Sequence, residues 1–279
     1  MHALSMLHRR LALSCPQLHR KRLNSLLAAV QAAVSGSRLA LSDLGRGICS
    51  AAGVKHNIKR VDRLLGNGAL HVEVAELYEA LARECLGGVK TPLIIVDWSD
   101  LSADRHWQLL RASMALQGRS VTLYEEVHPL SRAGTRRVCQ RFLARLGSML
   151  PPGCRPIVIT DAGFRSRWFQ LVNEIGWGWI GRIRNRDMVS VPGSGHWFGC
   201  KALYAKASAT AQALGRYAYV RSNPIACELV LVKRASRGRH KRSVLGKAVR
   251  SYHSLKQARS QREPWLFVTG HSIIPTSGH

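Results

Sequence analysis

The chain has 279 residues, with 42 Lys and Arg against 16 Asp and Glu, and a formal net charge of +26. A hydrophobic fraction of 46% is that of an ordinary globular protein and excludes a wholly disordered basic tail. The longest aliphatic run, residues 93–96, is far shorter than the roughly 20 apolar residues that span a bilayer, so we predict no membrane association.

The charge and the cysteines indicate the partner and the compartment. An excess of positive charge this large repels itself unless a polyanion is nearby, so nucleic acid is the expected partner. The seven cysteines are too widely spaced for a zinc ribbon or a disulfide scaffold. We therefore predict reduced thiols in a cytoplasmic, nucleoid-associated protein.

Residues 1–88 are predicted to form a helical DNA-binding domain. Leucine and valine residues recur at helical spacing between Leu18 and Val34, and the Ser-Gly-Ser run at 35–37 ends that helix. Ser42 resembles the N-cap of a second helix. Another helix is predicted over residues 72–85.

The most basic predicted helix covers residues 55–65 and is stopped by the Gly-Asn-Gly run at 66–68. Ile58, Val61 and Leu65 share one face, and the rest of the helix carries the predicted DNA contacts Lys55, Lys59, Arg60 and Arg63. A small helical bundle with one strongly basic member is typical of DNA-binding domains. The alternative is an ordinary solvated basic face.

From residue 89 the sequence pattern changes to a mixture of strands and helices. We first predict three strands, at 91–97, 109–116 and 120–127, and then a helix at 134–150. A strand at 156–160, a helix at 166–175 and a strand at 179–183 follow. The second and third strands are joined by a hairpin containing Arg119, which we add to the predicted DNA contacts. This α/β order is the layout of a ribonuclease-H-like core, predicted over 89–186.

Residues 187–269 are predicted to be a β-rich insertion with a basic tract. Its clearest strands are at 217–220, 227–232 and 264–269. Between Lys233 and Arg262 there are eleven Lys or Arg residues and no acid. The end, 270–279, is predicted to be disordered or frameshifted.

Two acids, Asp97 and Asp161, are the main candidates for chemistry. Each ends an apolar strand, so neighbouring strands would bring both carboxylates to one edge of a sheet. Carboxylates are the ligands that Mg²⁺ or Mn²⁺ prefers, and such ions support phosphodiester chemistry. Alternatively, each Asp only begins a turn, where Asp is common.

Other residues are weaker candidates. Asp100 could assist the acid pair, but a role in a turn is the simpler interpretation. Either Glu125 or Glu126 could face the pair from the third strand. The tryptophans Trp98, Trp177, Trp179 and Trp197 could stack on bases, but core packing is the default.

Several collinear runs extend from near the N-terminus to about residue 269: residues 18–26, 55–67, 96–100, 110–113, 118–125, 161–164, 222–225 and 263–265. In these runs the chain closely resembles the cut-and-paste DDE transposases of bacterial insertion sequences of family four. That group contains the transposase of the tetracycline-resistance transposon.

The resemblance implies a ribonuclease-H-like catalytic domain interrupted by a β-rich insertion, and a helical domain that binds the transposon end. Asp97 and Asp161 match the first two acids of the DDE triad, which uses Mg²⁺ or Mn²⁺. It also implies a homodimer that nicks double-stranded DNA at the transposon ends, forms and opens hairpins, and transfers strands into target DNA.

The third acid of such transposases lies in a helix with the pattern Y-x₂-R-x₃-E-x₆-K. After Thr269 this sequence contains no Glu and no helical periodicity, and Glu263 matches a non-catalytic position. We therefore expect a transposase polypeptide truncated before its third carboxylate and defective in catalysis. The alternative is a non-catalytic DNA-binding fragment that inhibits the full-length transposase.

Overall fold

The computed structural model describes residues 2–36, 38–184, 187–235, 243, 246–249, 251–252, 254–255 and 262–270. The chain divides into two compact units. One contains Met1–Gly87 with Ser148–Pro151, and the other contains Gly88–Gly147 with Pro152–His279. Most of the predicted basic tract, and the predicted disordered end from 271 onward, lie outside the described residues.

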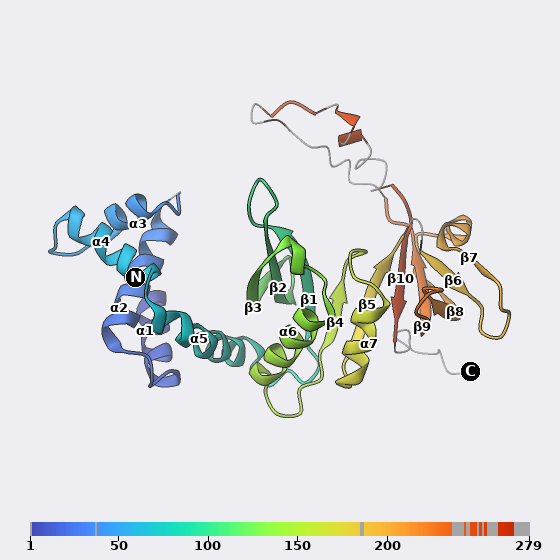
Figure 1. Cartoon of the computed structure of the whole chain (residues 1–279), viewed down its shortest axis with the longest axis horizontal. Coiled ribbons are helices and arrows are strands. Elements are labelled where there is room, and N and C mark those ends of the chain that lie inside the picture. Colours follow the sequence, from blue (N-terminus) through green and yellow to red (C-terminus); the bar gives the residue numbers. More distant parts are fainter. Residues whose placement is uncertain are drawn as a thin grey trace. The chain divides into compact units, whose positions relative to one another are not determined.

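The first unit is helical, as Figure 1 shows in blue and cyan. Its helices are α1 (His2–Ser14), α2 (Arg20–Ser35), α3 (Leu41–Gly47), α4 (Val54–Leu65) and α5 (Gly68–Leu86). Asn67 caps α5, because its side chain accepts a hydrogen bond from the amide of Leu70 at 3.0 Å. The predicted cap at Ser42 is wrong: α3 begins after Ala40, and no side chain caps it.

Apolar side chains from α2, from α3 and the residue that follows it, and from α4 form one buried cluster, made of Ala32, Leu44, Ile48 and Val61. Helix α4 also buries Leu64, whereas Leu65 is 56% exposed. The predicted face of Ile58, Val61 and Leu65 is therefore buried at Val61 but exposed at Leu65. Leu64 follows Val61 by three residues and so lies on the same side of the helix.

Helices α3 and α4 approach each other very closely at Gly45. A β-carbon placed on Gly45 would lie 2.5–2.7 Å from atoms of Ile58, including its backbone nitrogen and Cα. Only glycine permits this approach, so Gly45 determines where the two helices can cross.

The second unit contains a mixed α/β arrangement around one sheet. Its strands are β1 (Leu93–Asp100), β2 (Trp107–Leu116), β3 (Arg119–Pro129), β4 (Ile157–Thr160), β5 (Gly178–Ile183), β6 (Met188–Ser190), β7 (Trp197–Gly199), β8 (Gln212–Tyr219), β9 (Ile225–Val232) and β10 (Trp265–Thr269). The helices are α6 (Arg136–Met149) and α7 (Ser166–Glu174), with short 3₁₀ segments η1 (Leu130–Arg132) and η2 (Cys200–Lys206).

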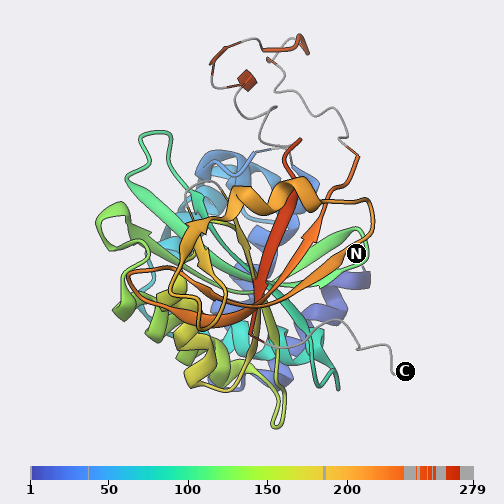
Figure 2. The same cartoon turned by 90° about the vertical axis from the view of Figure 1, so that its right-hand side faces the viewer.

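The strands form a 10-stranded sheet in the order β3-β2-β1-β4-β5-β10-β9-β8-β6-β7. β4 pairs in parallel with both β1 and β5, and the remaining pairs are antiparallel. The strands of the predicted β-rich insertion therefore continue the same sheet as those of the predicted core. Figure 2 shows β10, in red, near the middle of the view.

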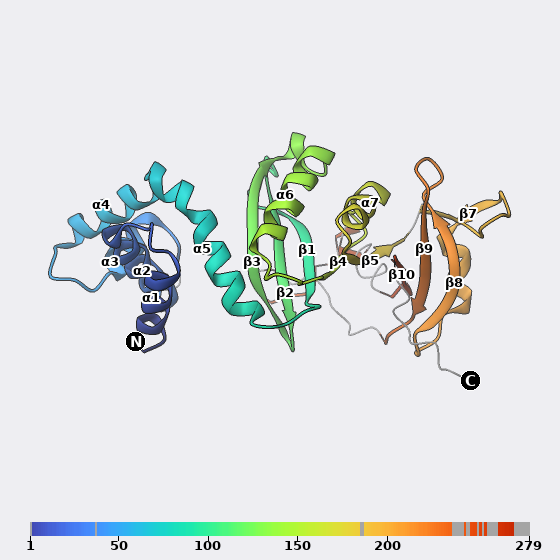
Figure 3. The ribbon, with the colours of Figure 1, turned by 90° about the horizontal axis from the view of Figure 1, so that it is seen from below.

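The sheet has one well-covered face beneath α6 and α7, which lie on the same side of strands β1–β5 in Figure 3. Ile94, Val96 and Val158 are fully buried on that side. On the other face Leu93 is 44% and Ile95 is 38% exposed. The burial of residues 93–96 of β1 and of β4 thus alternates between the two faces, although residues 93–96 and 157–159 are all apolar.

Aromatic packing joins α7 to the sheet. The ring of Phe169 stacks on that of Trp179, with centroids 4.4 Å apart, and lies directly over Gly181. Trp177 and Trp179 are buried, so the default interpretation of these two tryptophans as core residues is confirmed. All seven cysteines are free thiols.

Candidate active site

The central parallel strands bring Asp97 and Asp161 to the same edge of the sheet. Val96 of β1 is in register with Thr160 of β4, and each is followed directly by one of the two acids. Neighbouring strands lie about 4.7–4.9 Å apart, so the two aspartates occupy adjacent positions. β1 itself runs three residues beyond Asp97, to Asp100, because it continues to pair with β2.

The two carboxylates differ in their surroundings. Asp97 is half-buried, and its pKa is raised by burial and by repulsion from Asp161; hydrogen bonds and Arg111 offset part of this rise. One of these bonds comes from the Ser99 hydroxyl, 3.2 Å from Oδ2 of Asp97. Asp161 is exposed, and its Oδ1 accepts a hydrogen bond from the amide of Gly163 at 2.8 Å.

Two arginines flank the acid pair on the same row of the sheet. Arg111 of β2 lies directly opposite Asp97, and the β4–β5 register continues to place Arg182 beside Asp161. Residues directly opposite each other point to the same face. Asp161 is among the groups that raise the pKa of Arg182, although burial and Arg184 lower it overall. The guanidinium of Arg182 lies 4.7 Å from the ring centroid of Trp265.

Sequence reasoning did not identify Arg111 and Arg182 as neighbours of the acids. Arg182 is the one charged residue of an otherwise apolar strand, and Arg111 is the one charged residue of β2, so both can be noticed in the sequence. Their positions beside Asp97 and Asp161 depend on strand register, which the local sequence does not specify.

The other candidate acids lie elsewhere or have other partners. Asp100 is 3.3 Å from Arg105 and accepts a hydrogen bond from Gln108 at 2.9 Å. Glu125 lies opposite Arg111, one strand further from the pair. Glu126 accepts a hydrogen bond from Tyr124 and contacts His128 at 2.7 Å, in a network beside α6. Within the part of the chain that the structure describes, no group of three or more His, Cys, Asp or Glu residues could hold a metal.

Three of the predicted DNA contacts on α4 are exposed: Lys55, Lys59 and Arg63. Arg60 differs, because it is partly buried and its Nε donates a hydrogen bond to the Ser25 hydroxyl at 2.9 Å. Arg119 is exposed beside Gly118, which has a φ of +77° in the β2–β3 turn.

The acid pair is chemically suited to a divalent cation. Asp97 and Asp161 supply hard oxygen ligands, and repulsion from Asp161 is one of the causes that raise the pKa of Asp97, so a cation between them would be favoured. They would hold Mg²⁺ or Mn²⁺ as two ligands.

Comparison with protein-family models and with curated proteins gives no match. Among the described helices, none is both long and apolar enough to cross a membrane.

Proposed function

We propose that the chain is a DNA transposase polypeptide of the cut-and-paste DDE type, with Asp97 and Asp161 as the metal-binding acids. The observation that carries the proposal is that the two acids directly follow Val96 and Thr160, which are paired on adjacent parallel strands. Asp161 is close enough to raise the pKa of Asp97. The strand order β3-β2-β1-β4-β5, with α6 and α7 in the crossovers, supports a ribonuclease-H-like core.

A divalent metal at this pair would activate a water or a 3′-hydroxyl and stabilise the leaving oxygen. The residues of the chain have the task of holding the metal and the DNA. Asp97 and Asp161 supply the carboxylates, and the excess of positive charge holds the phosphate backbone.

The helical unit is the part of the chain that we propose binds the transposon end. Helices α3 and α4 are packed tightly through Gly45, and α4 presents Lys55, Lys59 and Arg63 to solvent. Two packed helices with a basic second helix are suited to contact DNA phosphates, and an α-helix fits the major groove. A homodimer would bring two transposon ends together.

These 279 residues carry two of the three acids that such transposases use, so we expect DNA binding without efficient cutting. Among the described residues, no group of three or more His, Cys, Asp or Glu residues could hold a metal, and this favours a second candidate function. In that role the chain occupies transposon ends and inhibits the full-length enzyme.

Mn²⁺ binding tests the proposal. The wild-type chain should show one weak site by calorimetry or paramagnetic broadening, and Asp97→Asn or Asp161→Asn should abolish it. At a free Mn²⁺ concentration of ten times Kd, binding should add about 1.4 kcal/mol to the free energy of unfolding.

Asp104→Asn is the matched control, because Asp104 is an exposed aspartate paired with Ser102 and the amide of His106. It should bind Mn²⁺ as the wild type does. Equal Mn²⁺ binding in the wild type and in both site variants would refute the metal site.

A further inference from the structure

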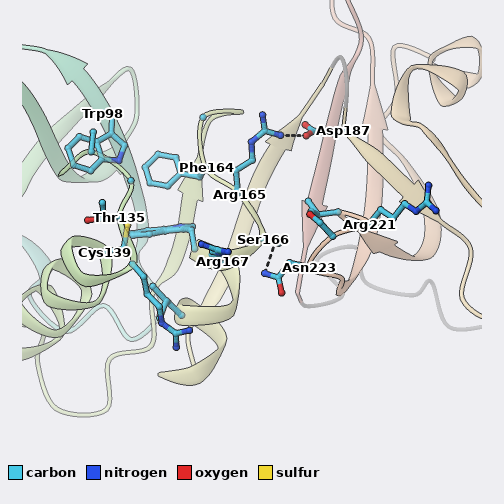
Figure 4. A pocket seen from close by; sticks show the side chains of 18 of the residues that line it. Trp98, Thr135, Cys139, Phe164, Arg165, Ser166, Arg167, Asp187, Arg221 and Asn223 are labelled. Carbon is cyan, nitrogen blue, oxygen red and sulfur yellow. Dashed lines mark hydrogen bonds and ion pairs between the residues drawn. The ribbon is translucent and has the colours of Figure 1, made fainter. Parts of the chain in front are cut away.

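A pocket of about 1310 Å³ lies at the amino ends of α6 and α7, and neither Asp97 nor Asp161 lines it. Figure 4 shows Trp98 and Phe164 on one side of it, Arg221 and Asn223 on the other, and Arg165 and Arg167 between them. The pocket belongs entirely to the second unit.

A buried donor without a partner lines this pocket. Trp168 is 3% exposed, and its indole Nε1 has no hydrogen-bond partner among the described residues. A buried N–H group that lacks an acceptor is costly. A ligand that supplies an acceptor oxygen would therefore be favoured here.

The charge of the pocket favours an anion. Four arginines line it, against one acid, Asp187. The side chain of Asp187 is 4% exposed and already paired with Arg165, so it adds little free negative charge. The amino end of α7 has no side-chain cap, and its first amides and dipole favour a phosphate.

The wall opposite Trp98 is held in a fixed shape. Asn223 donates hydrogen bonds to the Ser166 hydroxyl at 3.2 Å and to Oε1 of Gln170 at 3.0 Å. Val220, on the same wall, has a φ of +67°, which is strained for a β-branched residue. Such strain persists where the surroundings impose it, and it is concentrated at functional sites.

We propose that this pocket binds a nucleotide. Its phosphate lies at the amino end of α7 beside Arg167, its base stacks on the partly exposed ring of Trp98, and one of its acceptor oxygens receives the hydrogen bond of Trp168. That the nucleotide is part of a DNA strand rests on the proposed function. A free nucleotide offers the same phosphate, base and acceptor oxygens, and the experiment below distinguishes a free nucleotide from a DNA strand.

The indole N–H resonance of Trp168 reports on this site directly. In the ¹⁵N-labelled full chain it is identified by its loss in Trp168→Phe. It should shift on addition of thymidine 5′-monophosphate and of a short single-stranded oligothymidine. The Kd of each should be at least about tenfold lower than that of thymidine or inorganic phosphate alone, since only the nucleotides engage both parts of the pocket.

Arg167→Ala should weaken nucleotide binding about tenfold, because a hydrogen bond to a charged group is lost. The matched control is Arg137→Ala, an exposed arginine of α6 that does not line the pocket, which should leave the Kd unchanged.

If the Trp168 resonance does not shift, or if Arg167→Ala and Arg137→Ala change the Kd equally, the proposal that this pocket binds a nucleotide is overturned. A shift with the mononucleotide but not with the oligonucleotide would overturn the DNA strand as the ligand. The Mn²⁺ experiment at Asp97 and Asp161 is separate, so failure there with nucleotide binding intact would overturn only the proposed function.

Discussion

Asp97 holds its negative charge in an unfavourable position, because its carboxylate is half-buried beside that of Asp161. Its folded-state pKa is raised, so its contribution to stability is present below the unfolded pKa of about 3.9 and is lost as the pH rises through the folded pKa. At neutral pH the ionised pair therefore destabilises the fold. A metal site commonly carries such a cost when no metal is bound.

At the scale of single residues, Asp97→Asn should therefore raise the melting temperature at pH 7, and the difference from wild type should shrink as the pH approaches about 4. Asp104→Asn provides a control of opposite sign. Hydrogen bonds from Ser102 and His106 lower the pKa of Asp104, so its carboxylate stabilises the fold above its unfolded pKa. Thermal unfolding between about pH 4 and 7 measures the melting temperatures of both variants. A lower melting temperature for Asp97→Asn than for the wild type at pH 7 would contradict the claim that the ionised Asp97 destabilises the fold.

At the scale of elements, the α3–α4 crossing depends on Gly45. Gly45→Ala should destabilise the chain by about 1–3 kcal/mol, because the new methyl group overlaps backbone atoms of Ile58. Denaturant unfolding measures the loss. At Gly68, the first residue of α5, an added methyl group would have no neighbouring atom within 4 Å, so Gly68→Ala should be neutral or slightly stabilising. Equal effects of the two substitutions would show that the crossing tolerates a side chain.

The exposed face of α4 should contribute to DNA affinity. Lys59→Ala with Arg63→Ala should reduce the slope of log K against log salt by about 1.8, since each lost phosphate contact removes about 0.9. Fluorescence anisotropy with a labelled duplex at several salt concentrations measures the slope.

The control for this measurement is Arg9→Ala with Arg20→Ala, a pair of exposed arginines on α1 and α2 that removes the same charge. In this control the slope of log K against log salt should fall by much less than in Lys59→Ala with Arg63→Ala. Arg60 is omitted from the test, because its hydrogen bond to Ser25 gives it a role within the fold.

Local sequence predicted most elements, because periodicity and turn residues act within a few positions. The strand at residues 91–97 and the helix at 166–175 correspond to β1 and α7 within a few residues. The failure at Ser42 is an error of two residues at a helix end. Such details depend on how helices pack, which local propensity does not determine.

The site was predictable in part for the same reason. Asp97 and Asp161 were visible as acids after apolar strands, but their arginine neighbours arise from pairings across β2–β1 and β4–β5. The place of β10 between β5 and β9 joins residues more than thirty positions apart along the chain. No local pattern specifies such a pairing.

For the whole molecule, a net charge of +26 would dominate the proposed binding to DNA. Binding through 6–10 phosphate contacts would lose about 10³–10⁵ in affinity between 50 and 200 mM salt. Such binding needs no metal and no third carboxylate. In the proposed function, DNA affinity and DNA cleavage are therefore separable.

The final prediction is that the 279-residue chain binds a transposon-end duplex but nicks it poorly in Mn²⁺. Asp97 and Asp161 offer two acids where the proposed DDE chemistry uses three, and Glu126 is already engaged with Tyr124 and His128. The comparison is with the same chain extended by a helix of the pattern Y-x₂-R-x₃-E-x₆-K. The extended chain should nick at least about 10²-fold faster, since the electrostatic stabilisation supplied by the metal site is the largest part of such catalysis. Comparable nicking by both chains would mean that another carboxylate completes the site, and Glu125→Gln would then be the first variant to examine.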